Sequence, residues 1–362
     1  MGRALELAAR ARHLTSPNPM VGAIVLDGSG EFAGEGFHAR SGEPHAETLA
    51  MERAGARARG GTLYVTLEPC SHQGRTAPCA DAVVAAGVTR VVVAMEDPDR
   101  RVAGGGIRRM REAGISVEVG LEEEAARRLN RFYVKQRTTG LPWVTARFAA
   151  SLDGKIATAT GESRWITSEA ARLESHRLRE QHDAILVGAG TVAADDPELS
   201  NRLPEAARQP LRVVLDSKLR TPLTAKVLAG LDRQPTLVVT TPQAGERAIA
   251  ALGKTGAEVV TVDAAGPEQR VDLAQLLKLL GDRGLLSVLV EGGGEVTGAF
   301  FDSHLVDGVV AFLAPLIIGG KEAPGAVGGK GARQLADAFR LTNLEMRRIG
   351  DDILVSGECS PG

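Results

Sequence analysis

The pattern of apolar and polar positions in the first 136 residues predicts short strands that alternate with helices. Short apolar runs mark the expected strands, at 21–27, 31–37, 62–67, 90–95 and 115–119. The expected helices lie at 4–12, 45–58, 80–86, 107–112 and 122–136. A glycine-rich turn at 28–30 predicts that the first two strands form a hairpin. This alternation is typical of an α/β fold.

The same alternation continues through the second half, where no stretch of the first half is repeated. The expected strands are 143–149, 184–187, 212–215, 236–240, 258–262, 287–291 and 308–312. The expected helices are 169–180, 246–252, 273–280 and 296–301. Thr138-Thr139-Gly140-Leu141-Pro142 is the best linker candidate, and a chain of 362 residues exceeds one ordinary core. We therefore expect two domains, residues 1–139 and 140–362.

Three glycines, Gly292–Gly294, stand between the apolar strand 287–291 and the helix that begins at Val296. Glycine amides at the start of a helix can bind a phosphate group. A plain turn explains the same glycines equally well. The spacing is not Gly-x-Gly-x-x-Gly, so it does not indicate a Rossmann domain.

Composition and charge exclude several classes of partner. The chain is 43% hydrophobic and 24% charged, as in a soluble globular protein, and it contains no apolar run of about 18 residues. The N-terminal Met1–Glu6 includes an acidic residue and no long apolar stretch, which argues against a signal peptide. With a net charge of −2, two Trp and two Tyr, we expect neither nucleic acid nor a membrane as a partner.

Candidate chemistry is concentrated in His45, Glu47, Cys70 and Cys79. One imidazole and two thiols can hold Zn²⁺ and leave its fourth position open for water, which is the arrangement of a catalytic zinc site. Zn²⁺ lowers the pKa of bound water, and Glu47 is placed to move protons. This order of residues is that of the zinc deaminases.

The spacing leaves an alternative open, because eight residues separate Cys70 from Cys79 where Cys-x-x-Cys is usual. Taken singly, these residues are compatible with two buried cysteines and a surface histidine, but their joint order favours the metal site. If both cysteines bind metal, Cys359 has no disulfide partner, and a reducing cytoplasm fits. The remaining histidines outside this region are expected to be structural or surface residues: His13, His38, His176, His182 and His304.

The chain resembles the bifunctional deaminase–reductases of riboflavin biosynthesis over nearly its whole length, including the wide cysteine spacing. The matching stretches are Thr15–Gly22, Gly42–Glu47, Thr66–Cys79, Ser151–Lys155, Gly161–Thr167, Thr191–Pro197 and Val290–Gly293. The resemblance implies a cytidine-deaminase-like three-layer domain followed by a dihydrofolate-reductase-like domain. It also implies one catalytic Zn²⁺, NADPH, and assembly as a homodimer or homotetramer.

Two consecutive reactions follow from this resemblance. The first would hydrolyse the 2-amino group of 2,5-diamino-6-ribosylamino-4(3H)-pyrimidinone 5′-phosphate. The second would reduce the ribosyl group of 5-amino-6-(5-phosphoribosylamino)uracil to ribityl with NADPH.

The resemblance also implies residue roles in the deaminase. His45, Cys70 and Cys79 would bind zinc, and Glu47 would carry protons. Asn18, which is otherwise a plausible turn former between two prolines, would bind substrate. His72 and Arg75 would also contact substrate; a solvated loop is their ordinary alternative, and substrate contact is favoured over it.

In the reductase, Lys155 would lie in the active site, whereas an exposed lysine is its ordinary alternative. The substrate contacts implied are Ser163, Arg179, Leu199, Arg202 and Glu291. The NADPH contacts implied are Ala149, Trp165, Thr191, Asp195, Ser217, Gly293, Gly294, Glu295, Val296, Thr297, Gly298 and Ala299. Surface charge is the alternative for both arginines, and a core position is the alternative for Trp165.

Three other functions compete with this interpretation. A deaminase of tRNA or DNA bases would need a basic, aromatic surface and would leave the second half unexplained. A non-catalytic zinc-stabilised nucleotide-binding protein would have no use for Glu47. A deaminase with a non-catalytic nucleotide-binding second half remains open, since the sequence alone does not test either activity.

Overall fold

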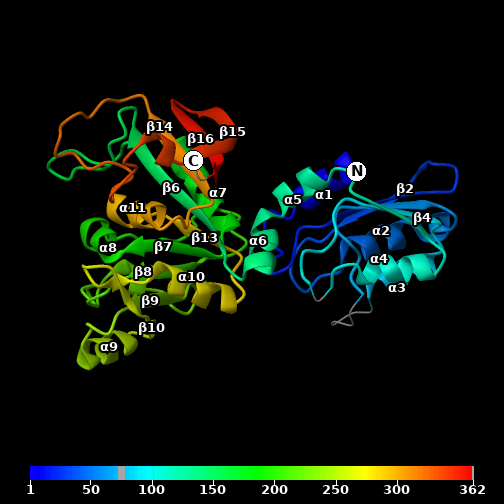
Figure 1. The fold of residues 1–362 in the computed structure, drawn as a ribbon, viewed down its shortest axis with the longest axis horizontal. Helices are drawn as coiled ribbons and strands as arrows, with labels where there is room; N and C mark the ends of the chain where they lie inside the picture. Colours follow the sequence, from blue (N-terminus) through cyan, green and yellow to red (C-terminus); the bar gives the residue numbers. More distant parts are fainter. Residues whose placement is uncertain (72–77, 101, 361–362) are drawn as a thin grey trace. The chain divides into compact units, whose positions relative to one another are not determined.

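The chain separates into two compact units, Met1–Gly140 and Leu141–Gly362, in a computed structural model that describes residues 1–71, 78–100 and 102–360 (Figure 1). Each unit has its own sheet and hydrophobic core. Within the described ranges, no helix combines the length and the apolar character needed to cross a membrane.

The first unit contains a five-stranded sheet in the order β2-β1-β3-β4-β5. Its strands are β1 (Gly22–Leu26), β2 (Phe32–Phe37), β3 (Thr62–Val65), β4 (Arg90–Val93) and β5 (Ser116–Val119). β1 runs antiparallel to both β2 and β3, so the predicted hairpin is confirmed, while β3, β4 and β5 are parallel.

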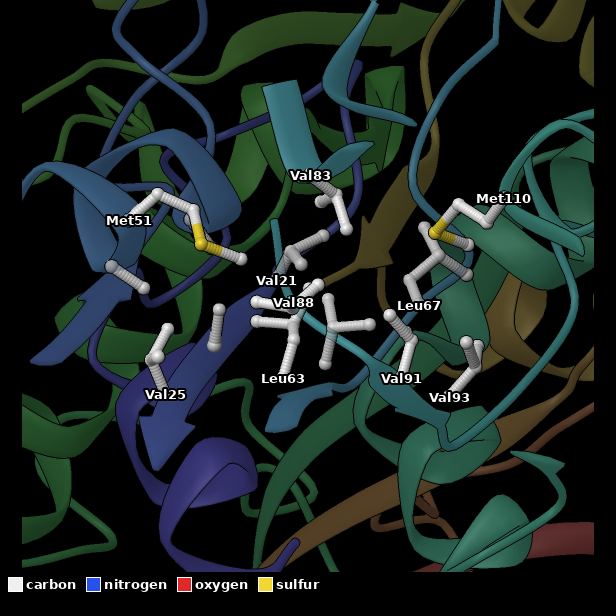
Figure 2. Close-up of a cluster of buried hydrophobic side chains, with 14 of the residues drawn as sticks. Val21, Val25, Met51, Leu63, Leu67, Val83, Val88, Val91, Val93 and Met110 are labelled. Carbon is white, nitrogen blue, oxygen red and sulfur yellow. The ribbon is translucent and has the colours of Figure 1, made fainter. Parts of the chain in front are cut away.

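Helices cover both faces of this sheet, which gives the three layers of a cytidine-deaminase-like fold. They are α1 (Gly2–Ala9), α2 (Ala46–Ala54), α3 (Cys79–Ala86), α4 (Gly105–Glu112), α5 (Glu123–Leu129) and α6 (Arg131–Thr139). Successive strand residues point to opposite faces. Val25 and Leu63 accordingly pack with Ala50 of α2 and Val83 of α3, whereas Ile24 packs with Leu7 of α1. Figure 2 shows the larger of these two clusters.

The helix expected at 4–12 covers Gly2–Ala9, and two other predicted helices differ from the structure for identifiable reasons. The helix expected at 45–58 stops at Ala54, because Gly55 takes a positive φ of 54° and a 3₁₀ turn, Gly55–Ala58, follows. The helix expected at 122–136 is divided into α5 and α6 at Asn130. The Asn130 side chain accepts from Met20 N at 2.8 Å and donates to Met20 O at 2.9 Å, so a tertiary contact decides the break.

The second unit contains a nine-stranded sheet in the order β10-β9-β8-β7-β13-β6-β14-β16-β15. The strands are β6 (Trp143–Ser151), β7 (Ala184–Gly188), β8 (Leu211–Leu215), β9 (Thr236–Thr240), β10 (Glu258–Thr261), β13 (Ser287–Val290), β14 (Gly308–Ala314), β15 (Arg340–Ile349) and β16 (Asp352–Ser360). All neighbours are parallel from β10 to β14, and the last two strands are antiparallel. A separate small sheet pairs β11 (Ala264–Ala265) with β12 (Arg270–Val271).

The helices that connect the parallel strands along the chain pack against this sheet, as the alternation predicts (Figure 1). They are α7 (Glu169–Gln181), α8 (Ala189–Asp195), α9 (Glu246–Gly253), α10 (Leu273–Asp282) and α11 (Gly294–Asp302), with short 3₁₀ turns at Lys226–Leu228 and Leu335–Asp337. The sequence pattern missed α8 and the β15–β16 hairpin. Most of β15 is exposed, so its side chains do not show the apolar alternation by which strands are recognised.

Candidate active sites

The three proposed metal ligands come from three separate elements and meet at one point. His45 is the N-cap of α2, Cys79 is the first residue of α3, and Cys70 follows β3. His45 Nδ1 lies 3.1 Å from Cys79 Sγ and 3.8 Å from Cys70 Sγ. The three donor atoms lie within 4.8 Å of one another. This convergence is a prerequisite for binding one metal ion.

The electrostatics of the cluster suit a cation with nitrogen and sulfur ligands. The Cys79 side chain hydrogen-bonds to Cys70 and lowers the pKa of Cys70, and the His45 side chain lowers it further. The same hydrogen bond, with burial, raises the pKa of Cys79. The two thiols therefore favour a state in which Cys70 is a thiolate and Cys79 keeps its proton. A bound cation is needed to stabilise both as thiolates. This donor set fits Zn²⁺.

Glu47 lies in the first turn of α2 and is 3% exposed. Burial raises the pKa of Glu47 to about 6. A carboxyl group with a raised pKa can both hold and release a proton near neutral pH. A bound cation would shift this equilibrium toward the carboxylate.

The cluster opens into a cavity of about 600 Å³, lined in part by Asn18, His38 and Glu47. His38 Nδ1 lies 3.2 Å from Pro44 O, which can only accept, so Nδ1 carries the proton. His38 Nε2 therefore accepts from Asn18 Nδ2, 3.3 Å away. Burial lowers the pKa of His38, which keeps the ring neutral. This contact holds the Asn18 amide in one orientation at the wall of the cavity.

His38, expected to be a structural or surface residue, is 2% exposed and also lines this cavity. No motif surrounds His38 in the sequence, but its position at the end of the predicted hairpin indicates where it lies. His38 N donates to Val21 O at 2.9 Å. The strand pair thereby brings His38 beside the segment that begins at Asn18. His72 and Arg75 lie outside the described residues.

In the second unit, Lys155 follows a tightly bonded turn at the end of β6. Ser151 Oγ donates to Asp153 Oδ1 at 2.6 Å, and Asp153 also accepts from the amides of Ile318 and Gly319 at 3.1 and 2.7 Å. The Ser151 hydrogen bond, followed by these amides, lowers the pKa of Asp153 to about 2. Lys155 Nζ donates to Ala323 O at 2.9 Å. Lys155 is half-buried, so the exposed-lysine alternative does not hold.

Arg179 and Glu291 form a buried bidentate ion pair. Arg179 Nε and Nη2 donate to the two carboxylate oxygens at 2.9 and 2.7 Å, and Arg179 Nη1 donates to Ser200 O at 2.9 Å. Burial alone raises the pKa of Glu291, but Arg179 and then Arg147 outweigh it and lower the pKa to about 2. Arg179 is therefore not a mere surface charge.

The sequence pattern missed Arg147, which comes from β6. Arg147 Nη1 lies 3.9 Å from Glu291 Oε2, its guanidinium lies over the ring of Phe312, and its Nε has no partner. The three side chains Arg147, Arg179 and Glu291 thus carry a net positive charge, which suits an anionic ligand nearby. An arginine inside an otherwise largely apolar strand was the available signal.

Arg202 is exposed, and its partner is a histidine that was expected to stand outside the site. The Arg202 amide donates to His176 Nδ1 at 3.3 Å, and Arg202 Nε approaches His176 Nε2 at 3.5 Å. Burial, Arg179 and Arg202 lower the pKa of His176 to about 4. A neutral His176 can accept from Arg202, so the structure places it among the residues implied for substrate.

A second cavity, of about 610 Å³, is lined by several of the residues implied for NADPH: Ser217, Glu295, Val296 and Ala299. Gly188–Gly190, at the start of α8, and the basic residues Lys218 and Arg220 also line it. Backbone amides at a helix start and nearby cations suit the phosphates of a dinucleotide. The donor groups present therefore fit NADPH.

Three other residues of the implied NADPH set, in the first turns of α11, pack closely within the second unit. Gly294 and Gly298 face Gly325 and Gly328, where an added Cβ would clash with the opposite backbone. Thr297 is buried. Close packing of α11 accounts for the small size of Gly294 and Gly298, while contact of this turn with the cofactor stays a prediction.

The remaining residues implied for substrate or NADPH do not all gather at one of the clusters described above. Gly293 N donates to Thr191 Oγ1 at 3.1 Å, so these two stand together. Leu199 is 3% exposed, and its side chain packs in a hydrophobic cluster; its contact with substrate stays a prediction. Trp165 is 68% exposed, which excludes a core role. Ala149 lies on β6. Ser163 lies two residues before Trp165, in the segment between β6 and α7. Asp195 O accepts from Arg164 Nη2 at 2.6 Å.

Comparison with known proteins covers the whole chain. The family model for the cytidine and deoxycytidylate deaminase zinc-binding region matches residues 1–95, and that for the RibD C-terminal domain matches residues 142–355. The chain is 45% identical to the riboflavin biosynthesis protein RibD of Bacillus amyloliquefaciens, covering 98% of this chain and 94% of that protein. It is 41% identical to RibD of Escherichia coli, with 98% and 96% covered.

Solved structures agree with these relatives. One form of Acinetobacter baumannii RibD superposes with a TM-score of 0.88 at 37% identity, covering 99% of this chain and 97% of that one. A diaminohydroxyphosphoribosylaminopyrimidine deaminase/5-amino-6-(5-phosphoribosylamino)uracil reductase from Thermotoga maritima gives 0.85 at 35% identity, with the same coverage.

Arg179→Met should destabilise the second unit by about 3 kcal/mol at pH 7, because it leaves Glu291 as a buried carboxylate without its bidentate partner. The folded pKa of Glu291 is depressed to about 2, so its contribution exists above its ordinary pKa of 4.5 and disappears as pH falls toward 2. The difference between variant and wild type should therefore shrink on acidification.

Urea unfolding followed by tryptophan fluorescence measures this difference selectively, because Trp143 and Trp165 both lie in the second unit. Arg202→Met, which removes an exposed charge, is the matched control and should change stability little. An equal loss of stability at pH 7 and pH 3.5 would contradict the assigned role of Glu291.

Proposed function

Because this chain belongs to the RibD family, we propose that residues 1–139 carry out its deamination and residues 140–362 its reduction. The protein is a bifunctional riboflavin-biosynthesis enzyme, a zinc-dependent deaminase and an NADPH-dependent reductase. It deaminates 2,5-diamino-6-ribosylamino-4(3H)-pyrimidinone 5′-phosphate and reduces 5-amino-6-(5-phosphoribosylamino)uracil. The convergence of His45, Cys70 and Cys79 beside a buried Glu47 is the observation that carries the residue assignment.

We assign the zinc ligands to His45, Cys70 and Cys79, and the proton carrier to Glu47. Zn²⁺ held there supplies a Lewis acid that makes water a better nucleophile at neutral pH. Glu47 takes the proton of the attacking water, gives it to a ring nitrogen of the pyrimidine, and assists departure of ammonia. Its buried position and raised pKa suit both directions of transfer.

Asn18 and His38 orient the pyrimidine in this proposal. His38 stays neutral and holds the Asn18 amide in one orientation. Asn18 then presents its remaining polar atoms to the ring edges of the substrate. His72 and Arg75 retain the substrate role implied by the family resemblance.

In the reductase, we propose that the 610 Å³ cavity binds NADPH, which supplies the hydride when bound. Lys155, anchored through the Ser151–Asp153 turn, hydrogen-bonds to the ribosyl oxygen and provides the proton for the new hydroxyl group. Arg179 and Arg202, with Ser163 and Glu291, bind the phosphorylated side chain. The net positive charge contributed with Arg147 supports this placement of a phosphate.

Glu47→Gln should lower the rate of ammonia release by about 10²- to 10⁴-fold, because an amide side chain cannot carry the proton. Zinc content should remain at the wild-type level, since Glu47 is not among the ligands. NADPH oxidation with the deaminated intermediate should also be unchanged. Loss of both activities together would contradict the separation of the two sites.

Lys155→Ala should have the opposite effect, lowering NADPH oxidation with the deaminated intermediate by about 10²-fold or more. Ammonia release from the diamino substrate should continue at the wild-type rate. Following ammonia and NADPH absorbance in the same sample measures both steps. Lys278→Ala, which removes an exposed lysine paired with Asp282, is the matched control. Unchanged reductase turnover in Lys155→Ala would remove Lys155 from the mechanism.

We also propose that the protein works in the cytoplasm as a homo-oligomer assembled through β15. This ten-residue strand is the sheet's edge and exposes the apolar residues Leu344 and Met346, at 53% and 66%. Exposed edges of this kind favour pairing with another chain. Light scattering should give a mass above 37.9 kDa, and Met346→Glu should lower it. A monomeric wild type would contradict the assembly.

A further inference from the structure

The deaminase cavity contains a second buried glutamate, Glu68, whose side chain accepts hydrogen bonds from four backbone amides of the described residues. It is 3% exposed. Oε2 accepts from Asp97 N at 3.2 Å and from Gly104 N at 3.0 Å, and Oε1 accepts from Gly106 N at 2.8 Å and Ile107 N at 3.2 Å. A carboxylate offers about four acceptor sites. With four donors bound, the acceptor sites of Glu68 are all used by the backbone.

Three of these amides belong to the start of α4. The first amides of a helix have no partner within the helix, and the N-cap Gly104 has no side chain to satisfy them. A carboxylate placed there is stabilised by the helix dipole as well as by the hydrogen bonds. Glu68 therefore caps α4 from a distant part of the sequence.

The same bonds restrain the chain that leads into Cys70, two residues further on. The Glu68 amide donates to Met95 O at 3.0 Å, which joins it to the segment after β4. Gly106 packs so closely on Pro69 that an added Cβ would clash with the Pro69 carbonyl. The Cys70 carbonyl in turn accepts a hydrogen bond from Ala80 N of α3 at 3.1 Å. The backbone of Cys70 is thus fixed between α4 and α3.

We propose that Glu68 is a positioning residue of the zinc site, which sets where Cys70 Sγ lies relative to His45 and Cys79. This role rests on the proposed assignment of those three residues as the zinc ligands. Outer groups that orient metal ligands typically contribute 10- to 100-fold to metal affinity. Glu68 does so through the backbone rather than by touching a ligand side chain.

Glu68→Gln is the decisive variant, because it keeps the shape of the side chain and changes only its donor and acceptor character. An amide has one oxygen and one NH₂ group, so two of the four backbone amides would face a donor in either orientation. We expect zinc transfer to a chelator to become at least 10-fold faster. In the Co²⁺-substituted protein, the thiolate-to-cobalt absorption bands should shift, because the Cys70 sulfur moves.

Two further variants make the comparison specific. Glu118→Gln removes a carboxylate of the same unit from an exposed ion pair with Arg90, and it should leave both readouts unchanged. Cys70→Ser removes one proposed sulfur ligand directly and gives the cobalt spectrum of a site with a single thiolate. Glu68→Gln should lie between the wild type and Cys70→Ser.

Near-UV circular dichroism establishes that each variant is folded. If Glu68→Gln does not fold, Glu68→Asp is measured in the same way, since it keeps the charge but is one methylene shorter, and an intermediate effect is expected. A folded variant with wild-type zinc release and cobalt bands, but a lower unfolding temperature, would overturn the positioning role and leave Glu68 as a helix cap. A wild type that binds neither metal, or an unchanged spectrum in Cys70→Ser, would instead overturn the ligand assignment.

Discussion

The deaminase unit depends on bringing the starts of two helices to one point. His45 caps α2, Cys79 opens α3, and their ligand atoms stand 3.1 Å apart. The approach is possible because the facing residues are small, with Ala46, Ala50 and Ala80 fully buried between the helices and the sheet. Positive helix ends then favour thiolate and carboxylate at the same place. A larger residue at these alanines would separate the two helix starts.

Three buried glutamates show how environment determines the role of one residue type. Glu47 is buried without a bidentate cationic partner, which raises its pKa to about 6 and suits it to proton transfer. Glu291 is held by Arg179, with Arg147 near, so its pKa falls to about 2 and it stays charged. Glu68 binds four backbone amides and serves the architecture. Their sequence neighbourhoods alone do not distinguish these states.

Most elements could be predicted because strand and helix periodicity is local. The failures have two physical origins, contacts between distant residues and the exposure of an edge strand. Asn130 interrupts a helical pattern because it bonds to Met20, and β15 escapes detection because its exposed edge carries no alternating pattern. Gly294 and Gly298 also allow the close approach of Gly325 and Gly328, which the glycine run alone does not reveal.

The sequence by itself determined which residue types are available for zinc binding and proton transfer, the two-domain organisation expected from its patterns, and the resemblance to the riboflavin deaminase–reductases. These follow from residue identity and spacing, which are properties of the chain. Only the tertiary structure decided that His38 orients Asn18, that Arg147 joins the Arg179–Glu291 pair, and that Glu68 binds α4. Each of these depends on a distance between residues far apart in sequence, which folding alone establishes.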